Sequence, residues 1–237
     1  MGDESITHFG IVVMSKSRGY RLTRENYATI SNKSTHGKNM HYIQALKDNN
    51  QRIIEIYSKV YADEEGLVYC ESWCKKRLFD AMQNFDFNME FFRKLDPTKF
   101  NEELTRFLNT TDFFEITDLS EFSCPGYYVM VIGEYCQIYI GTSTDIKRRI
   151  KQHWSGGKMK LDRLLCGDTT RSKLSIDSFR ALDTTRIFVC PTDNTYCKED
   201  EYITYFSDKF VCNRIKGGKI EFGTLDALVG IKTRDLE

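Results

Sequence analysis

Two short patches that each combine tyrosine with glycine are the first residues of this chain that could do chemistry. They are Gly126-Tyr127-Tyr128 and Tyr139-Ile140-Gly141. A tyrosine hydroxyl can donate or accept a proton, but with a pKa of about 10 it is a poor base at neutral pH unless a cation lies nearby. Arg149 follows the second patch by eight residues. Its planar donors suit a phosphate whose negative charge builds up during a reaction.

Arg149 and His153 lie four residues apart on a segment that is predicted to be a helix. The apolar residues of this segment also recur every four positions, at Ile146, Ile150 and Trp154. Asp145 or a neighbouring Ser or Thr can cap the start of the helix, which should end at residues 155–157. Because residues four apart share a helix face, Arg149 and His153 should project together beside the apolar stripe. His153 could orient an attacking water or contact a leaving phosphate, and a purely structural role stays open.

A second predicted helix, residues 197–209, carries a carboxylate on its apolar face. Glu199 precedes Tyr202 and Ile203 by three and four residues, so the three share one face. A carboxylate there costs free energy unless a cation or strong donors hold it. Glu201 points roughly the opposite way and should be solvated. Glu199 is therefore the candidate metal ligand, although a glutamate in a first helical turn is also favoured by the helix dipole alone.

The two tyrosine patches should lie on neighbouring strands of a hairpin. The apolar and aromatic runs that predict these strands are residues 127–132 and 137–140. A two-residue turn at Glu134 and Tyr135 pairs Met130 with Tyr139, which puts Tyr128 on the same face as Tyr139. A three-residue loop would put the two tyrosines on opposite faces, because side chains alternate along a strand.

Taken in order, these residues resemble the GIY-YIG nuclease family. The resemblance covers about residues 124–218, and Tyr127 replaces the middle isoleucine of the signature. It implies a small domain with a three-stranded antiparallel sheet flanked by helices, which hydrolyses phosphodiester bonds by in-line attack of water. The catalytic residues that it implies are Tyr128, Tyr139, Arg149, His153, Glu199 and Asn213.

The resemblance also implies a role for each of these residues. Tyr128 helps to deprotonate or align the water, Tyr139 supports that network, and Asn213 braces the loops of the site. Arg149 neutralises the charge that develops on the phosphate. Glu199 holds one divalent metal, expected to be Mg²⁺ with Mn²⁺ as the alternative. A single carboxylate suits magnesium, which keeps most of its waters when bound.

The fold class expected for the whole chain is α+β, in two domains. Residues 1–120 should form a mostly helical domain whose role is unassigned, with targeting or DNA recognition as candidates. Residues 121–237 should form the GIY-YIG-like nuclease domain, because turn residues and Pro125 mark a boundary near residue 120. The remaining predicted strands are residues 9–14 and 185–190, and the remaining helical patterns are residues 43–57, 72–94 and 100–108.

Basic residues are concentrated in two stretches, although the chain carries no net charge. These stretches are residues 16–52 and 147–173. Because charges are screened beyond roughly 10 Å at ordinary salt, a local basic stretch can hold phosphates even when the total is zero. We expect the second stretch to bind nucleic acid through Lys147, Arg148, Lys151, Lys158 and Lys160. The alternative is a solvated face balanced by acids nearby in space.

These observations lead us to expect a divalent-metal-dependent endonuclease that acts on double-stranded DNA, in a restriction, phage-defence or mobile-element context. The alternatives are a nuclease that cuts RNA, or a non-catalytic nucleic-acid-binding protein with the same fold. No apolar run is long enough to span a membrane, and no signal peptide is present, so we expect a cytoplasmic location and no membrane partner. A homodimer would bring the two sites that cutting both strands requires.

Overall fold

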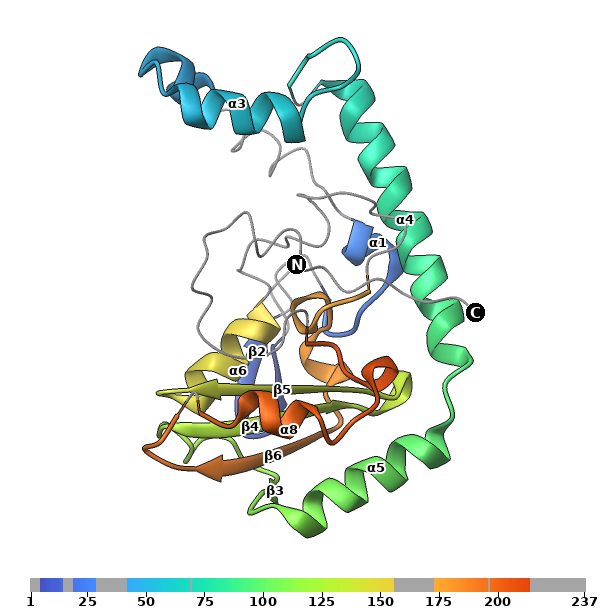
Figure 1. The fold of residues 1–237 in the computed structure, drawn as a ribbon, viewed down its shortest axis with the longest axis vertical. Coiled ribbons are helices and arrows are strands. Elements are labelled where there is room, and N and C mark those ends of the chain that lie inside the picture. Colours follow the sequence, from blue (N-terminus) through green and yellow to red (C-terminus); the bar gives the residue numbers. More distant parts are fainter. Residues whose placement is uncertain are drawn as a thin grey trace.

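The computed structural model describes residues 5–14, 19–28, 42–68, 70–155, 173–195 and 197–213. It combines helices with an antiparallel sheet, as Figure 1 shows, which confirms the α+β class. Among the described residues, no helix has both the length and the apolar character needed to cross a bilayer.

The central sheet has four antiparallel strands in the order β3-β6-β4-β5. The strands are β3 (Phe114–Ile116), β4 (Gly126–Ile132), β5 (Gln137–Ser143) and β6 (Arg186–Pro191). The three predicted strands are present, but the prediction of three strands in total is wrong. β3 adds a fourth by pairing with β6, and an ion pair of 2.7 Å between Glu115 and Arg186 joins the two.

The β4–β5 hairpin has the predicted register, with Met130 opposite Tyr139 and Tyr128 opposite Gly141. Its loop is longer than the predicted two-residue turn. Residues Gly133–Tyr135 form a short 3₁₀ helix, and Cys136 closes the loop in the left-handed conformation with φ 48°. The longer loop keeps the register because the residues that it adds are shared equally between the two strands, so both tyrosines still face the same way.

Side-chain alternation along β4 divides the core between the two faces of the sheet. On one face, Tyr127, Val129 and Val131 pack against α5 (Pro97–Thr110) and α8 (Glu199–Ile203). On the other face lie Tyr128, Met130 and Ile132, with α6 (Ile146–Ser155) and the end of α4 (Glu71–Arg93). We call these the α5 face and the α6 face.

The helix ends follow local capping chemistry in two cases and tertiary contacts in a third. Asp145 caps α6, because its carboxylate accepts from the backbone N–H of Arg148 at 2.8 Å, as predicted. The helix predicted over residues 197–209 is present but shorter, since α8 ends at Ile203. The reason is that the N–H of Ser207 donates to the carboxylate of Glu103 on α5 at 2.7 Å, which draws the chain out of the helix. α5 begins at Pro97 after Asp96, whose carboxylate accepts from Thr98 N at 2.9 Å.

The chain before residue 120 contributes to the same core as the chain after it. Leu22, Tyr27 and Phe92 belong to the hydrophobic cluster that contains Tyr128. The strand predicted over residues 9–14 is present as β2 (Ile11–Met14), but it begins two residues late. Phe9 and Gly10, with positive φ, form the turn of a hairpin with β1 (Ser5–His8), a strand that was not predicted. The division into two domains near residue 120 stays a prediction, and any division has to accommodate this shared core.

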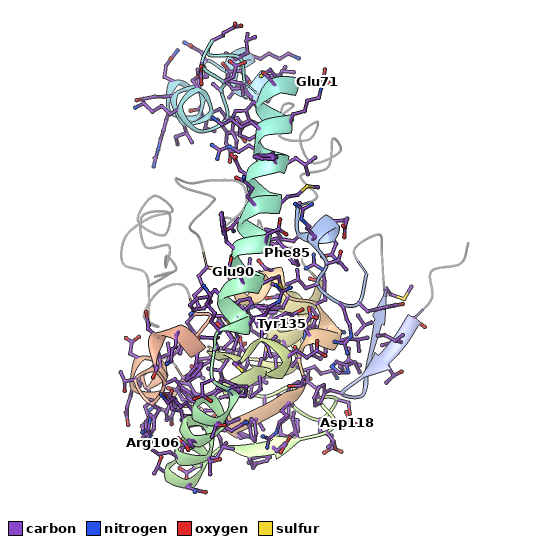
Figure 2. The ribbon with its side chains drawn as sticks, turned by 90° about the vertical axis from the view of Figure 1, so that its right-hand side faces the viewer. Glu71, Phe85, Glu90, Arg106, Asp118 and Tyr135 are labelled. Carbon is purple, nitrogen blue, oxygen red and sulfur yellow. The ribbon has the colours of Figure 1, made fainter. Side chains whose placement is uncertain are left out.

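A helical arm stands away from the sheet (Figure 1). It consists of α3 (Gln51–Val60) and the first turns of α4, where Tyr61 and Trp73 make a small core of their own. Figure 2 shows α4 running from Glu71 at the far end to the region of Tyr135. At the near end α1 (Arg24–Ala28) packs on α4, and Asn84 donates to the Tyr27 hydroxyl at 2.6 Å.

Candidate active site

Strands β4 and β5 and helix α6 bring four of the predicted residues together on the α6 face. The Tyr128 and Tyr139 rings lie 6.0 Å apart, and the His153 ring meets Tyr139 edge-on at 5.0 Å. The Tyr128 hydroxyl and His153 Nε2 are 2.9 Å apart, a hydrogen bond. Both side chains are buried, with His153 2% exposed. Arg149 lies one turn before His153 on the same helix, as the spacing predicted.

Gly141 makes room for Tyr128 within this cluster. The two residues are paired across the strands, and the tyrosine ring lies over the glycine. A Cβ atom at position 141 would stand 2.5 Å from the Tyr128 hydroxyl oxygen and 2.6 Å from its Cζ. Contacts that short do not occur, so any other residue here would displace the ring. The glycine of the second patch is thus a steric requirement of the tyrosine of the first.

Arg149 supplies the positive charge of the cluster. The nearby Tyr128 feels this charge, since Arg149 acts to lower the pKa of its hydroxyl. Burial lowers the pKa of Arg149, but the nearby oxygens of Tyr128 and Tyr139 raise it more, so its pKa is raised overall. Arg149 also donates to Gln152 Oε1 at 3.4 Å. The result is a partly buried cation beside two phenols, which is an environment that attracts an anion.

Both phenols keep their protons at neutral pH. Burial raises the pKa of Tyr128 well above 10, the neighbouring Tyr139 raises it further, and Arg149 only partly offsets this. Burial also raises the pKa of Tyr139, with Glu199 adding to the effect. Arg149 therefore does not lower the pKa of Tyr128 enough to make the phenol a base at neutral pH. If Tyr128 accepts a proton, it has to give up its own proton at the same time.

Glu199 lies partly buried at the start of α8, while Glu201 is exposed as predicted. Burial raises the pKa of Glu199 to about 7, the neighbouring Asp200 raises it, and Arg149 lowers it. The charge of Glu199 also raises the pKa of both Tyr128 and Tyr139, so the carboxylate lies near the cluster. Among the described residues, none makes a direct hydrogen bond or ion pair with the Glu199 carboxylate.

Asn213 braces β5 and stays behind the cluster. Its side chain accepts from Ile140 N at 3.0 Å and donates to Ile140 O at 2.6 Å. Ile140 stands between Tyr139 and Gly141 on the edge strand of the sheet. By pairing both backbone groups of Ile140, Asn213 holds the strand that positions these two residues, which is a bracing role of the kind that the resemblance implies.

Tyr127 points to the opposite face and holds the chain just before Glu199. Its hydroxyl accepts from the backbone N–H groups of Cys197 at 2.9 Å and Lys198 at 3.0 Å. It also donates to Asn194 O at 3.0 Å. The residue that departs from the family signature is thus a support for the turn that places the carboxylate.

Asp177 joins the cluster although the sequence did not single it out. It lies in a short 3₁₀ helix, Ile176–Ser178, and its Oδ1 is 2.7 Å from His153 Nδ1. Its side chain is 21% exposed, beside a histidine that is almost fully buried. The two residues are 24 positions apart in the chain, and no helical or strand periodicity connects them, so no sequence signal could have identified the pair.

The predicted nucleic-acid-binding residues differ in their exposure and in their contacts within the chain. Arg148 and Lys151 are exposed on α6 and point away from the cluster's interior. Lys147 donates from Nζ to the backbone oxygen of Ser120 at 2.9 Å, so part of its hydrogen-bonding capacity is used within the chain. Lys158 and Lys160 lie outside the described residues.

A divalent metal fits the donor set at Glu199. In the described part of the chain, no group of three or more His, Cys, Asp and Glu side chains is arranged to hold a metal ion. A site with one protein carboxylate is instead the sparse kind that magnesium accepts when substrate phosphates and waters complete its shell. The desolvated carboxylate, whose charged form lacks a direct partner among the described residues, is chemically suited to such a cation.

No protein-family model, curated protein or solved structure matches this chain. Any inference about function therefore rests on the geometry of the cluster. That geometry offers one fixed cation, one carboxylate without a direct partner in the described structure, and a buried phenol bonded to a histidine. Together these groups can bind a phosphodiester, hold a divalent cation and move a proton.

Proposed function

We propose that this protein is a divalent-metal-dependent endonuclease that hydrolyses phosphodiester bonds in double-stranded DNA. The observation that carries the proposal is the convergence of Tyr128, Tyr139, His153 and Arg149 on one face of the sheet, near enough to Glu199 for its charge to raise the pKa of both tyrosines. Each of these residues has many ordinary explanations when taken singly. Glu199 lies 71 positions from Tyr128 in the chain, and its charge raises the pKa of Tyr128 only because the fold brings the two residues near each other.

Arg149 binds the scissile phosphate in this proposal. Its guanidinium is already partly buried near Tyr128, so little reorganisation is needed when charge develops on the phosphorus oxygens. A planar fork can contact two of those oxygens at once, which a lysine cannot do. Arg149 is therefore expected to act mainly in the transition state.

Tyr128 aligns the attacking water, and Tyr139 packs against it to fix the ring. The hydroxyl of Tyr128 reaches the cluster between Arg149 and His153. Glu199 would hold a magnesium ion, with manganese as a substitute. When bound, the ion would supply Lewis acidity at the phosphate and at the leaving oxygen.

The exposed residues Arg148 and Lys151 extend the positive surface of α6 beyond the cluster. They suit the neighbouring backbone phosphates of a nucleic acid, which a protein contacts for positioning and not for sequence. One cluster of this kind cuts one strand at a time, so a homodimer is the arrangement that we propose for cutting both. A restriction, phage-defence or mobile-element role is the biological context of the proposal.

The test is a cleavage assay on supercoiled plasmid DNA and on single-stranded RNA, with Mg²⁺, with Mn²⁺ and with EDTA. We expect nicking or linearisation of the plasmid with either metal and none with EDTA. Glu199→Ala should abolish cleavage while DNA binding in a gel-shift assay stays close to that of the wild type. Glu201→Ala is the matched control, because it removes an exposed carboxylate two residues away.

The other outcomes of this experiment would change the proposed function or the assignment of the metal ligand. Cleavage of RNA alone would replace the DNA substrate by RNA. Binding of either nucleic acid without metal-dependent cleavage would make the chain a binding protein and overturn the proposal. Normal cleavage by Glu199→Ala, with loss in Glu201→Ala, would overturn the assignment of the metal ligand.

A further inference from the structure

We propose that Asp177 is a positioning residue that sets the tautomer of His153, so that His153 can take the proton of Tyr128 as Tyr128 takes a proton from the attacking water. This proposal rests on the proposed endonuclease function. It adds to it a residue, Asp177, and a direction for the proton.

The three side chains form a continuous line of hydrogen bonds. Asp177 Oδ1 is 2.7 Å from His153 Nδ1, and His153 Nε2 is 2.9 Å from the Tyr128 hydroxyl. His153 is 2% exposed, so its ring is fixed by these partners and by packing on Tyr139. The line ends at the Tyr128 hydroxyl, which lies near Arg149, the residue proposed to bind the phosphate.

The protonation pattern follows from the chemistry of the end groups. An ionised carboxylate can only accept hydrogen bonds, so His153 Nδ1 has to be the donor toward Asp177. A neutral imidazole that carries its hydrogen on Nδ1 has an acceptor at Nε2. The Tyr128 hydroxyl, a neutral phenol, then donates to Nε2. Its oxygen lone pairs stay available for the Arg149 guanidinium and for a hydrogen of the attacking water.

The step balances as follows. The oxygen of the water forms a bond to phosphorus as the bond from phosphorus to the leaving ester oxygen breaks. One hydrogen of the water passes to the Tyr128 oxygen while the Tyr128 hydrogen passes to His153 Nε2. His153 becomes an imidazolium facing the Asp177 carboxylate, the leaving oxygen is protonated from solvent, and the imidazolium later returns its proton to solvent through the same line.

The relay answers the difficulty that the burial of Tyr128 creates. A free phenolate would be rare at neutral pH in this site, because burial holds the pKa of Tyr128 well above 10. A phenol that gives up one proton while it accepts another never has to become a full phenolate. Proton transfer assisted by a positioned side chain contributes roughly 10²- to 10⁴-fold to a rate.

The competing explanation is that Asp177 only ties the 3₁₀ helix Ile176–Ser178 to α6. A tie of that kind would be kept by any side chain that hydrogen-bonds to Nδ1. A relay requires that Nδ1 be the donor. Asp177→Asn separates the two ideas, because its volume is unchanged while its amide NH₂ can donate to Nδ1 and so favour the tautomer with hydrogen on Nε2.

The experiment compares full-length wild type, Asp177→Asn and Asp177→Glu in two measurements. The first is a ¹H–¹⁵N correlation spectrum of the histidine ring nitrogens without substrate, with His153 assigned through His153→Gln. The second is single-turnover cleavage of plasmid DNA with Mg²⁺ at saturating enzyme. We expect hydrogen on Nδ1 in the wild type and a shift toward Nε2 in Asp177→Asn. We expect a rate loss of roughly 10²- to 10⁴-fold in that variant, partial recovery in Asp177→Glu, and DNA affinity that changes by less than about threefold.

Two results would overturn the relay while leaving the endonuclease proposal intact. One is hydrogen on His153 Nε2 in the wild type, and the other is cleavage by Asp177→Asn within about twofold of the wild-type rate. If the wild type does not cleave at all, the proposed function fails first, and the spectrum still reports whether Asp177 sets the tautomer. A loss of folding in Asp177→Asn would show in its thermal unfolding curve, and the wild-type tautomer would then decide alone.

Discussion

Tyr127 and Tyr128 are neighbours in β4 and are equally buried, at 2% and 0% exposed, yet their partners differ in kind. Among the described residues, the hydrogen-bond partners of the Tyr127 hydroxyl are all backbone groups, those of Asn194, Cys197 and Lys198. The Tyr128 hydroxyl faces the side chains of His153 and Arg149. The backbone groups that hydrogen-bond to Tyr127 cannot change their protonation, whereas the His153 partner of Tyr128 can. The alternation of one strand thus separates a residue that supports a turn from the one that we propose takes part in the reaction.

The same division extends to the two faces of the sheet. On the α5 face, Tyr127 packs edge-on against Tyr202 at 5.2 Å, and Phe107 packs edge-on against Tyr202 at 5.9 Å. On the α6 face, the polar cluster is enclosed by Ile146, Ile150 and Trp154 of the helix that carries Arg149 and His153. A tightly packed face behind the sheet gives the reacting face the fixed geometry that catalysis needs.

The largest effect that we expect within this comparison is at Arg149. Arg149→Lys should cleave almost as poorly as Arg149→Ala, because a point charge cannot replace the planar fork. Arginines in comparable phosphoryl-transfer roles contribute roughly 10³- to 10⁵-fold in rate. Single-turnover cleavage at saturating enzyme measures this loss. Substrate affinity should fall much less, since the contact is strongest in the transition state.

Arg148→Ala is the matched control for this prediction. Arg148 is the next residue on α6 and is exposed, so its removal should weaken DNA binding and leave the rate at saturation nearly unchanged. Rates near that of the wild type for Arg149→Ala would show that Arg149 is an ordinary surface cation.

The second prediction compares Tyr128→Phe directly with Tyr127→Phe. Tyr128→Phe should lose roughly 10²- to 10⁴-fold in rate, because it removes the hydroxyl between the water and His153. Tyr127→Phe should reduce the rate less than about tenfold but lower the unfolding free energy by about 1–3 kcal/mol, since it leaves the N–H groups of Cys197 and Lys198 without that acceptor. Urea unfolding and single-turnover cleavage of both variants give the two values. Equal rate losses in the two variants would contradict a catalytic role for Tyr128 and a structural role for Tyr127.

A third prediction concerns the glycine that the reacting face needs. Gly141→Ala should displace the Tyr128 ring, because its Cβ would stand 2.5 Å from the hydroxyl oxygen. We expect a rate loss of roughly ten- to a hundredfold, by analogy with small misplacements of reacting groups, and about 1–3 kcal/mol of destabilisation from overpacking. In a Tyr128→Val background the destabilisation by Gly141→Ala should shrink, which a double-mutant cycle measures. An unchanged cost in that background would show that the ring is not what Gly141 accommodates.

The periodicity of the sequence correctly predicted the features of the site that depend on residues close together in the chain. The strand alternation and the hairpin register put Tyr128 and Tyr139 on one face, and the four-residue spacing on α6 put Arg149 beside His153. Helix periodicity also separated Glu199 from Glu201. In each case the relevant residues are held by the same strand pair or helix, so the pattern in the chain is already the pattern in space.

Several parts that the sequence did not reveal depend on contacts between distant segments. Asp177 reaches His153 across 24 residues, and Glu115 on β3 reaches Arg186 on β6 across 71. α8 is shorter than its helical pattern because Glu103 binds Ser207 from 104 positions away. Such contacts are determined by tertiary packing and not by local propensity, so the periodicity of the sequence does not predict them.

The smallest effect that we expect is on stability and concerns Glu199. Burial raises the pKa of Glu199 to about 7, with Asp200 adding to the shift. Between its ordinary value of about 4.5 and about 7, the unfolded chain has lost this proton while the folded chain keeps it, so stability falls as pH rises through that window. The side chain in Glu199→Gln is neutral at every pH, so it does not titrate and causes no such loss of stability. Without metal, we therefore expect the variant to match the wild type near pH 4.5 and to exceed it at pH 8 by about 1–2 kcal/mol, a figure reduced for solvent screening of the partly exposed carboxylate.

Thermal unfolding of both proteins between pH 4.5 and 8 in EDTA measures this gap, which should be a few degrees at pH 8. Burial also raises the pKa of Asp183, to about 6, but Asp183 titrates in both proteins and cancels in the difference. Glu201→Gln, which alters an exposed carboxylate, should show no gap that grows with pH. Mg²⁺ at pH 8 should raise the melting temperature of the wild type and leave that of Glu199→Gln unchanged, because binding to the folded state alone stabilises it. A gap that stays constant with pH, or an equal response of both proteins to Mg²⁺, would contradict a desolvated metal-binding carboxylate at this position.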